Sequence, residues 1–496
     1  MGIKKKVLVI GAGFSGLSAS ACLAAKGFEV TVLEKNSMAG GRARQFSSHG
    51  FTFDMGPSWY WMPEVFEDYF ALFNKKVSDY YTLDRLDPSY KICFGKDDEV
   101  ILPASLEDIY KLYESLEPGS AANLEKFLSE SEYKYKTGMG KFVRKPSHSV
   151  TEYFSWEILK AGLKLNMFSS FGAYTRRYFR SAKIRRMLEF PVLFLGGTAE
   201  TTPALYSLMN YSDMVQGTWY PRGGMYRVVE AMENLALEQG VKFIYNAEVK
   251  EVKITDNRIV SLSTVAETLE ADFVVASGDY HHIEQQLLPE SHRKYREQYW
   301  DKRVLSPSSL IFFMGFNTSI PGLSHHTLLF DEDFRDHAES IYGKPAWPEN
   351  PSIYISCTSK TDKGVAPDGH ENVFVLIPVA PGLEDTGEIR DHYQQMVMSR
   401  LERYTGQPLK DHLVFVRSYA HRDFENDYHA YKGNAYGLAN TLMQTAFLKP
   451  SMKNPKIKNL MYAGQLTVPG PGVPPAIISG QMAAEEIYKL SKTVTI

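Results

Sequence analysis

The sequence predicts an α/β fold in which a Rossmann-like nucleotide-binding domain, assembled discontinuously from separate stretches of chain, carries an inserted α+β domain. The chain has 496 residues, more than the roughly 250–300 at which single hydrophobic cores stop growing, so we expect two domains. A strand, a glycine-rich turn, a helix and a second strand follow one another between residues 7 and 34. Similar buried-strand and glycine-rich patterns return within 216–290 and 451–496, after long stretches of different character.

The N-terminal motif has the spacing of a dinucleotide-binding turn. Residues 7–10 are a continuous β-branched and leucine run, typical of a strand buried on both faces. Gly11 is expected to allow the tight turn, Gly13 to let a pyrophosphate approach the backbone, and Gly16 to let the helix pack closely on the strand. The helix start offers N–H groups and a positive dipole to phosphates. The next strand ends at Glu34, whose carboxylate can accept hydrogen bonds from ribose hydroxyls. Spacing alone leaves FAD and NAD open.

Two segments after this motif carry a family resemblance. Glu34 and Lys35, followed after three residues and Ala39 by Gly40-Gly41-Arg42, resemble the extended signature of the flavin amine-oxidase and phytoene-desaturase superfamily. Residues 53–59 resemble the family segment that passes near the isoalloxazine ring. The resemblance implies FAD as the cofactor; the alternative for Arg42 is a surface salt bridge. The cofactor contacts implied here are Gly11, Gly13, Phe14, Ser15, Gly16, Glu34, Lys35, Gly41, Arg42, Gly56, Pro57, Ser58 and Trp59.

The C-terminal part extends the resemblance. A strand at 460–464 enters a Gly/Pro-rich loop at 469–475, and a helix is expected over 476–490. This pattern is similar to the C-terminal signature of bacterial-type carotenoid desaturases, where loop and helix meet the flavin. Earlier in the chain, the resemblance also implies that the backbone at Val249 contacts the adenine, as at the like position in relatives. The implied contacts are therefore Val249, Gly464, Gln465, Gly472, Val473 and Pro474. Gln465 departs from the acid of many relatives, and Val468 replaces the histidine of many phytoene desaturases.

The remaining chain predicts the second domain. We expect the FAD-binding domain to comprise 1–80, 216–290 and 451–496, and the substrate-facing domain to comprise 81–215 and 291–450. Helices are expected across 105–145 with a break at Pro118-Gly119, and strands at 308–316 and 371–379. His281, His282 and Glu284 are expected on a surface helix. They are not expected to form a metal cluster, because neighbouring helical side chains point about 100° apart and do not easily share a metal ion. No metal site is predicted.

Composition limits the partners. Hydrophobic residues make up 44% and charged residues 23%, and the net charge of −3 argues against a nucleic-acid partner. Three scattered cysteines predict no disulfide framework. The run Lys4-Lys5-Lys6 before an apolar stretch resembles a signal peptide, but the cofactor-type glycines interrupt it. The excess of basic residues across 151–195 is either a membrane-docking element or a solvated surface. A cytoplasmic protein that associates peripherally with a membrane surface is expected.

The resemblance predicts an FAD-dependent desaturase of a long acyclic carotenoid of the phytoene type, acting by hydride transfer from an allylic C–H to flavin. Alternatives are a desaturase of a modified carotenoid such as a 1-hydroxycarotenoid (the 3,4-desaturase type), an amine oxidase, a carotenoid isomerase, a nicotinamide dehydrogenase, and a non-catalytic flavin scaffold or membrane-surface binding protein. The electron acceptor is expected to be oxygen or a quinone. No catalytic base can be assigned from the sequence.

Overall fold

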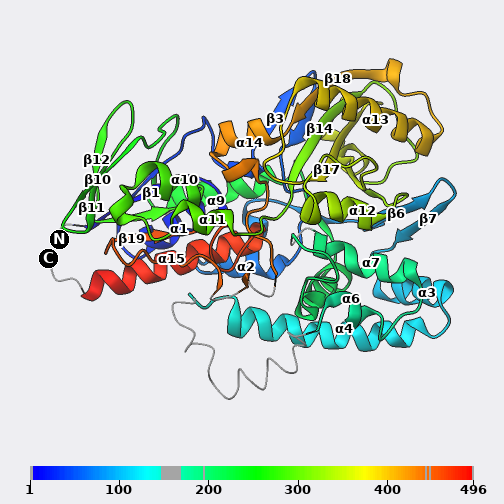
Figure 1. Ribbon diagram of the computed structural model, residues 1–496, viewed down its shortest axis with the longest axis horizontal. Helices are drawn as coiled ribbons and strands as arrows, with labels where there is room; N and C mark the ends of the chain where they lie inside the picture. The colour runs from blue at the N-terminus through cyan, green and yellow to red at the C-terminus, as the bar shows by residue number, and fades with distance from the viewer. Residues whose placement is uncertain (1–3, 147–168, 194–195, 442–443, 446–447, 494–496) are drawn as a thin grey trace.

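The computed structural model describes residues 4–146, 169–193, 196–441, 444–445 and 448–493. Two sheets dominate it (Figure 1): a parallel sheet at one end of the molecule and a larger mixed sheet at the other, with a group of helices beneath the mixed sheet. The domain boundaries expected from the sequence remain a prediction.

The parallel sheet draws its strands from three distant parts of the chain. Its order is β19-β13-β1-β2-β9, and every neighbouring pair is parallel. Val7 and Val9 of β1 are fully buried, as expected for a central strand covered on both faces. The strands are β1 (Lys6–Ile10), β2 (Glu29–Leu33), β9 (Lys242–Ile244), β13 (Phe273–Ala276) and β19 (Leu460–Tyr462).

Three helices pack with this sheet: α1 (Phe14–Ala25), α9 (Tyr226–Glu238) and the C-terminal α15 (Val473–Thr493). Helices α1 and α15 lie in close contact, because a Cβ added at Gly480 would come within 2.3 Å of the Ser15 carbonyl oxygen. Only a residue without a side chain fits there, so the last helix is held directly against the nucleotide-binding turn.

The mixed sheet has seven strands in the order β18-β14-β17-β16-β15-β6-β7. All pairs are antiparallel except β15 with β6. The strands predicted at 308–316 and 371–379 are confirmed as β14 and β17. Its strands are β6 (Tyr90–Gly95), β7 (Asp98–Leu102), β14 (Ser308–Phe316), β15 (His326–Leu329), β16 (Ile353–Ser356), β17 (Glu371–Val379) and β18 (Leu413–Tyr419).

Helix α13 (Gly387–Thr405) covers one face of the mixed sheet through Tyr393, Val397 and Leu401. The predicted helix break is confirmed, because α3 (Leu106–Leu116) and α4 (Ser120–Thr137) are separated by Gly119 at φ +84. The other helices are α2 (Pro63–Ala71), α6 (Phe171–Thr175), α7 (Ala182–Leu193), α8 (Leu208–Asn210), α10 (Tyr280–His282), α11 (Glu297–Asp301), α12 (Phe334–Ala338) and α14 (His421–Tyr428).

Three small sheets contain the remaining strands of the described residues. A three-stranded sheet contains β10 (Glu251–Thr255), β11 (Arg258–Ser263) and β12 (Thr268–Glu270). Residues 247–250 lead into β10 as a connection, and its Ala247 N–H donates to the Glu34 carbonyl at 2.8 Å. The remaining ribbons pair β3 (Gln45–Ser48) with β4 (Phe51–Asp54), and β5 (Leu83–Arg85) with β8 (Trp219–Pro221).

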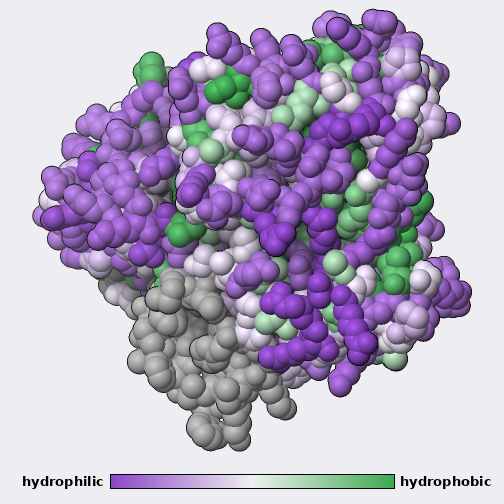
Figure 2. Space-filling model, turned by 45° about the vertical axis from the view of Figure 1, so that its right-hand side comes forward, coloured by the Kyte–Doolittle hydropathy of each residue, from purple (hydrophilic) through white to green (hydrophobic). Residues whose placement is uncertain are grey.

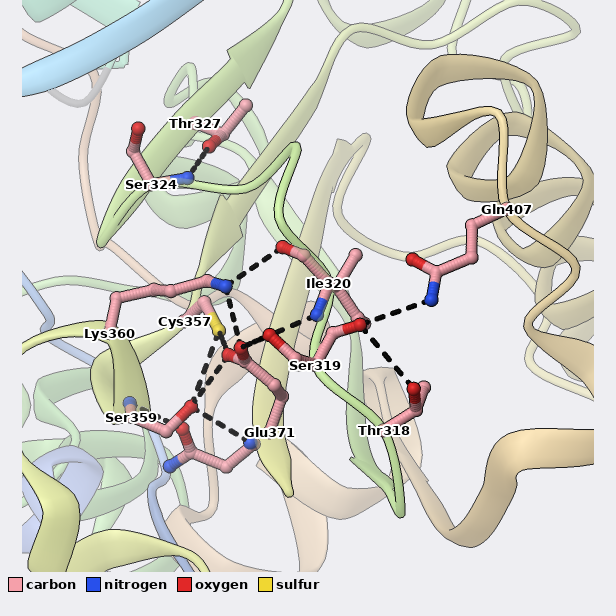
Figure 3. Close-up of polar contacts among 11 residues, drawn as sticks. Thr318, Ser319, Ile320, Ser324, Thr327, Cys357, Ser359, Lys360, Glu371 and Gln407 are labelled. Atoms are coloured by element: carbon pink, nitrogen blue, oxygen red, sulfur yellow. Dashed lines mark hydrogen bonds and ion pairs between the residues drawn. The ribbon is translucent and has the colours of Figure 1, made fainter. Parts of the chain in front are cut away.

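A polar cluster fixes one end of the mixed sheet (Figure 3). Glu371, at the start of β17, accepts hydrogen bonds from the Cys357 thiol at 2.7 Å and the Ser359 hydroxyl at 2.9 Å, and it forms an ion pair with Lys360. Lys360 also donates to the Ile320 carbonyl at 2.8 Å. The cluster therefore joins the ends of β16 and β17 to the loop that follows β14. All three cysteines are free and buried.

The surface is largely polar on the face drawn in Figure 2, where hydrophobic residues occupy small areas between hydrophilic ones. Within the described ranges, no helix is both long and apolar enough to cross a membrane.

Candidate cofactor and substrate site

One cavity of about 410 Å³ joins the two sheets. Its wall includes the glycine turn after β1, the ends of β2, β13 and β19, and side chains from β14, β16 and β17. The volume lies in the range of small-molecule sites. Gly16 is the one predicted cofactor residue that does not line it; those that do are Gly11, Gly13, Phe14, Ser15, Glu34, Lys35, Gly41, Arg42, Gly56, Pro57, Ser58, Trp59, Val249, Gly464, Gln465, Gly472, Val473 and Pro474.

The glycine turn has the geometry that its spacing suggests. Gly11 adopts φ +95, which favours glycine. A Cβ at Gly13 would meet no protein atom within 4 Å, so the space beside it opens into the cavity. A Cβ at Gly16 would lie 2.0 Å from the Gly11 carbonyl oxygen, so this glycine serves helix packing. No side chain caps α1, so its first N–H groups face the cavity as an anion-binding helix start.

Glu34 is buried at the end of β2, with 5% of its surface exposed. Its Oε2 accepts from the Ala12 N–H at 2.7 Å, and its Oε1 accepts from the backbone and side-chain nitrogens of Asn36. Each carboxylate oxygen has two lone pairs, so acceptor capacity remains for a ligand hydroxyl in the cavity. Lys35 is turned partly away, because its ammonium donates to the Asn426 carbonyl.

Arg42 is held inside the site, not in a surface salt bridge. Its Nη2 donates to the Asn434 carbonyl at 3.2 Å, and its guanidinium lies 5.1 Å from the centre of the Tyr428 ring. Burial lowers the pKa of Arg42, and the charge of Asp279 opposes that shift. Its Nε is buried and has no hydrogen-bond partner among the described residues. A buried cation with a vacant donor suits an anionic ligand.

The segment after Arg42 and the C-terminal loop form the adjoining walls. Gly56 packs against the Arg42 backbone, where a Cβ would approach its carbonyl oxygen to 2.3 Å. The Gly464 N–H donates to the Ser479 hydroxyl at 3.0 Å, and the Gln465 side chain donates to Asn434 at 3.2 Å. Helix α15 begins at Val473, three residues earlier than predicted, since prolines fit the first helical turn.

The other part of the wall is apolar and aromatic. Trp59 and Trp61 lie with ring centroids 5.0 Å apart. Opposite strands contribute Ile311, Leu376 and Tyr354, which are direct neighbours across β14, β17 and β16. Sequence reasoning missed these three, because strands buried on both faces give no alternation to mark the cavity side. Further lining residues that it missed are Met62, Met209, Ser309 and Tyr436.

No cluster of metal-binding side chains occurs in the described part of the chain. The surface helix expected around His281 and His282 is corrected to a half-buried one. The His282 ring stacks on His429, and Glu284 is fully buried, where it accepts hydrogen bonds from the Lys294 and Tyr295 N–H groups. The chain continues as a π-helical turn over Ile283–Leu287, in which Ile283, Glu284 and Gln285 are buried.

The geometry fits a dinucleotide that carries an aromatic ring system. The open space at Gly13, the uncapped start of α1 and the vacant Arg42 donor suit the anionic part. Trp59 and the β14–β17–β16 side chains offer an apolar region beside it. The Rossmann-type end would hold the nucleotide, and the aromatic end is open to a second, apolar molecule.

Comparisons with known proteins identify the group. The family of flavin containing amine oxidoreductases matches residues 14–488. A carotenoid 3,4-desaturase from Haloarcula japonica is 40% identical over 97% of this chain and 98% of its own. A zeta-carotene-forming phytoene desaturase from Myxococcus xanthus is 30% identical over 97% and 94%. Cyclohexylamine oxidase from Brevibacterium oxydans has the same fold, with a TM-score of 0.59 and 16% identity over 99% of this chain and 100% of its own.

The chain therefore belongs to the flavin-containing amine oxidoreductases, and its cofactor is FAD. Its relatives over nearly the full length are carotenoid desaturases, and the enzyme is an FAD-dependent oxidoreductase of that group.

Proposed function

We propose that the enzyme introduces a double bond at the 3,4 position of a long acyclic carotenoid, with a 1-hydroxylated carotenoid as the substrate class. The observation that carries this proposal is the greater identity to the carotenoid 3,4-desaturase than to the phytoene desaturase. Val468, which stands where many phytoene desaturases carry histidine, is buried and does not line the cavity, so its side chain does not bear on this choice.

The reaction removes two hydrogens from neighbouring carbons. When bound, FAD accepts one of them as a hydride, and the other leaves as a proton while its C–H electron pair forms the new π bond. The protein's part is to hold the polyene and exclude water. Because a hydrocarbon chain offers few polar contacts, its affinity comes from burial against Trp59, Trp61, Ile311 and Leu376, at roughly 25 cal/mol per Å².

The test is expression in bacteria that accumulate either phytoene or a 1-hydroxylated acyclic carotenoid, with pigments separated by chromatography and identified by absorption. A product with one further conjugated double bond from the hydroxylated substrate alone supports the proposal. Conversion of phytoene in the same assay assigns the enzyme to phytoene-type desaturation instead. A Gly13→Val variant is the matched negative control, since the added side chain occupies the opening beside α1.

Peripheral membrane association is part of the proposal, because the substrate dissolves in lipid. The basic stretch supports it only partly: Lys183 pairs with Asp98, and Arg186 donates to the Phe330 and Glu332 carbonyls. Residues 151–168 and 194–195 of that stretch lie outside the described residues. Flotation with anionic and neutral vesicles at low salt tests this part, and recovery only in the soluble fraction contradicts it. Turnover in anaerobic vesicles with and without quinone distinguishes a membrane quinone from oxygen as the electron acceptor.

A further inference from the structure

A chain of hydrogen bonds leads from the cavity into the mixed sheet. The Ser58 hydroxyl lies 2.7 Å from the Tyr354 hydroxyl, and the Tyr354 hydroxyl lies 2.8 Å from Nδ1 of His326. Ser58 and Tyr354 line the cavity, whereas His326 does not. Three separate elements supply the chain: the segment after β4, strand β16 and strand β15. The chain thus connects the flavin-side segment to the substrate-side sheet.

His326 is completely enclosed. Its exposed fraction is 0%, and the indole of Trp59 stacks on its ring at 4.0 Å with an interplanar angle of 11°. Its Nε2 has no hydrogen-bond partner among the described residues. The neighbouring His325 lies with its ring centroid 4.5 Å away and is hydrogen-bonded to Thr361. The polar contact of His326 with the cavity therefore runs through Tyr354.

Three acidic groups around the cavity already have partners. Asp279 accepts from the His282 and Tyr431 N–H groups, and Asp427 accepts from Arg44 and the Tyr419 hydroxyl. Glu248 pairs with His429 and Lys250. These residues come from the segments around the nucleotide-binding turn and α14, whereas Ser58 and Tyr354 adjoin Trp59 in the aromatic wall. Of the hydroxyl groups at this wall, which include those of Ser309 and Tyr436, the Ser58–Tyr354 pair is hydrogen-bonded to a histidine, so a released proton has a base there.

We propose that Ser58, Tyr354 and His326 form the path that accepts the proton lost from the carotenoid, an inference that rests on the proposed desaturation. The substrate proton moves to the Ser58 oxygen as the serine proton passes to Tyr354 and the tyrosine proton passes to His326 Nδ1. The broken C–H bond leaves its electron pair in the new double bond, and bound FAD would take up the hydride from the neighbouring carbon. His326 ends the step as an imidazolium.

A weak base is sufficient for this step. A carbon next to a cation that is delocalised along a polyene is a strong acid, so its proton transfers even to a poor acceptor. Burial, and then the neighbouring His325, lower the pKa of His326 well below its ordinary value. The imidazolium therefore returns its proton readily once product leaves and water enters, which resets the path for the next turnover.

The experiment measures flavin reduction by the carotenoid under anaerobic conditions, in the FAD-loaded enzyme mixed with carotenoid-containing vesicles. Tyr354→Phe breaks the path and should lower the limiting rate of flavin reduction about 100-fold, while the half-saturating substrate level changes less than about threefold. Tyr393→Phe is the matched control, because it removes another buried tyrosine hydroxyl, one that donates to the Pro348 carbonyl.

A second pair of variants protects the test against misfolding. Ser58→Ala should slow flavin reduction to a similar extent, and Ser58→Thr, which keeps the hydroxyl, should restore most of the rate. Wild-type reduction rates in Tyr354→Phe and Ser58→Ala, or a loss confined to substrate affinity, would overturn the proton path alone. A wild-type flavin that stays oxidised with every carotenoid overturns the proposed function and the path together.

Discussion

The carboxylate of Glu34 accepts a hydrogen bond from the Ala12 N–H at 2.7 Å, which ties the end of β2 to the glycine turn after β1. The contact holds the turn open on the cavity side and fixes the carboxylate beside it. Both parts of the nucleotide site therefore depend on one buried side chain.

Replacing Glu34 tests this arrangement. Glu34→Gln removes the charge and forces an amide N–H toward the Ala12 or Asn36 donors, so FAD affinity should fall about tenfold, equivalent to roughly 1.4 kcal/mol. Titration of the FAD-free protein, followed by flavin fluorescence, measures the change. Glu29→Gln, at the exposed start of the same strand, should bind FAD as the wild type does.

Substitutions at Gly13 and Gly16 should have different effects, the first on FAD affinity and the second on the free energy of unfolding. Gly16→Ala places a methyl 2.0 Å from the Gly11 carbonyl oxygen and should cost about 3 kcal/mol of unfolding free energy. Gly13→Ala meets no protein atom and keeps an allowed φ of −74, so the FAD-free protein should be nearly unchanged, whereas FAD affinity falls at least tenfold. Thermal unfolding and FAD titration of both variants give the comparison; equal effects on both quantities would refute it.

The Glu371 cluster should stabilise the mixed sheet in a pH-dependent way. Burial alone would raise the pKa of Glu371, but hydrogen bonds from Cys357 and Lys360 bring it below the ordinary value. Its contribution is therefore fully present above the unfolded pKa of about 4.3 and is lost as the pH falls through the lower folded value. Glu371→Gln should cost about 2–3 kcal/mol at pH 7, and the difference should shrink as the pH falls below about 4.

Denaturant unfolding at several pH values measures this difference. Glu267→Gln, on an exposed turn, is the control and should not differ from the wild type by more than about 0.5 kcal/mol. A gap between wild type and Glu371→Gln that stayed constant down to about pH 3 would contradict the assignment.

Lys449 is a buried amine beside the C-terminal Gly/Pro loop. It is 4% exposed, and its Nζ has no hydrogen-bond partner among the described residues. Burial lowers the pKa of Lys449 from 10.5 to about 7. Between about pH 7 and pH 10.5 the Lys449 amine is protonated in the unfolded chain and neutral in the folded protein. Over that range this group should therefore raise the wild-type free energy of unfolding by about 1.4 kcal/mol for each pH unit.

Lys449→Met removes that dependence. The variant should be more stable than the wild type near pH 6, and its advantage should disappear toward pH 10; unfolding curves at both ends of this range measure it. Lys96→Met, on an exposed turn, is the matched lysine control. A stability advantage of Lys449→Met that stayed the same across this pH range would contradict the lowered pKa. It would show that the Lys449 amine is uncharged in both the folded and unfolded states, or that it is paired in the folded protein.

Local patterns predicted residues that line the Rossmann-type end of the cavity. Gly11, Gly13, Glu34 and Arg42 are close in sequence, and their motif fixes their neighbours in space. Tyr354, Ile311 and Leu376 could not be found in this way, because they meet only through the pairing of three strands. Their side chains are typical of any sheet core, and their role depends on which face of that sheet closes the cavity.

The parallel sheet also has a consequence for synthesis on the ribosome. Its edge strand β19 and the helix α15 that packs on α1 come from residues 460–493, whereas its central strand begins at Lys6. The chain must emerge as far as residues 460–493 before the first glycine turn has all its walls, so the early segments wait with unpaired edges. FAD therefore binds late during synthesis of the chain. Cells short of riboflavin would accumulate chains that have been synthesised but lack the ligand that stabilises the closed site.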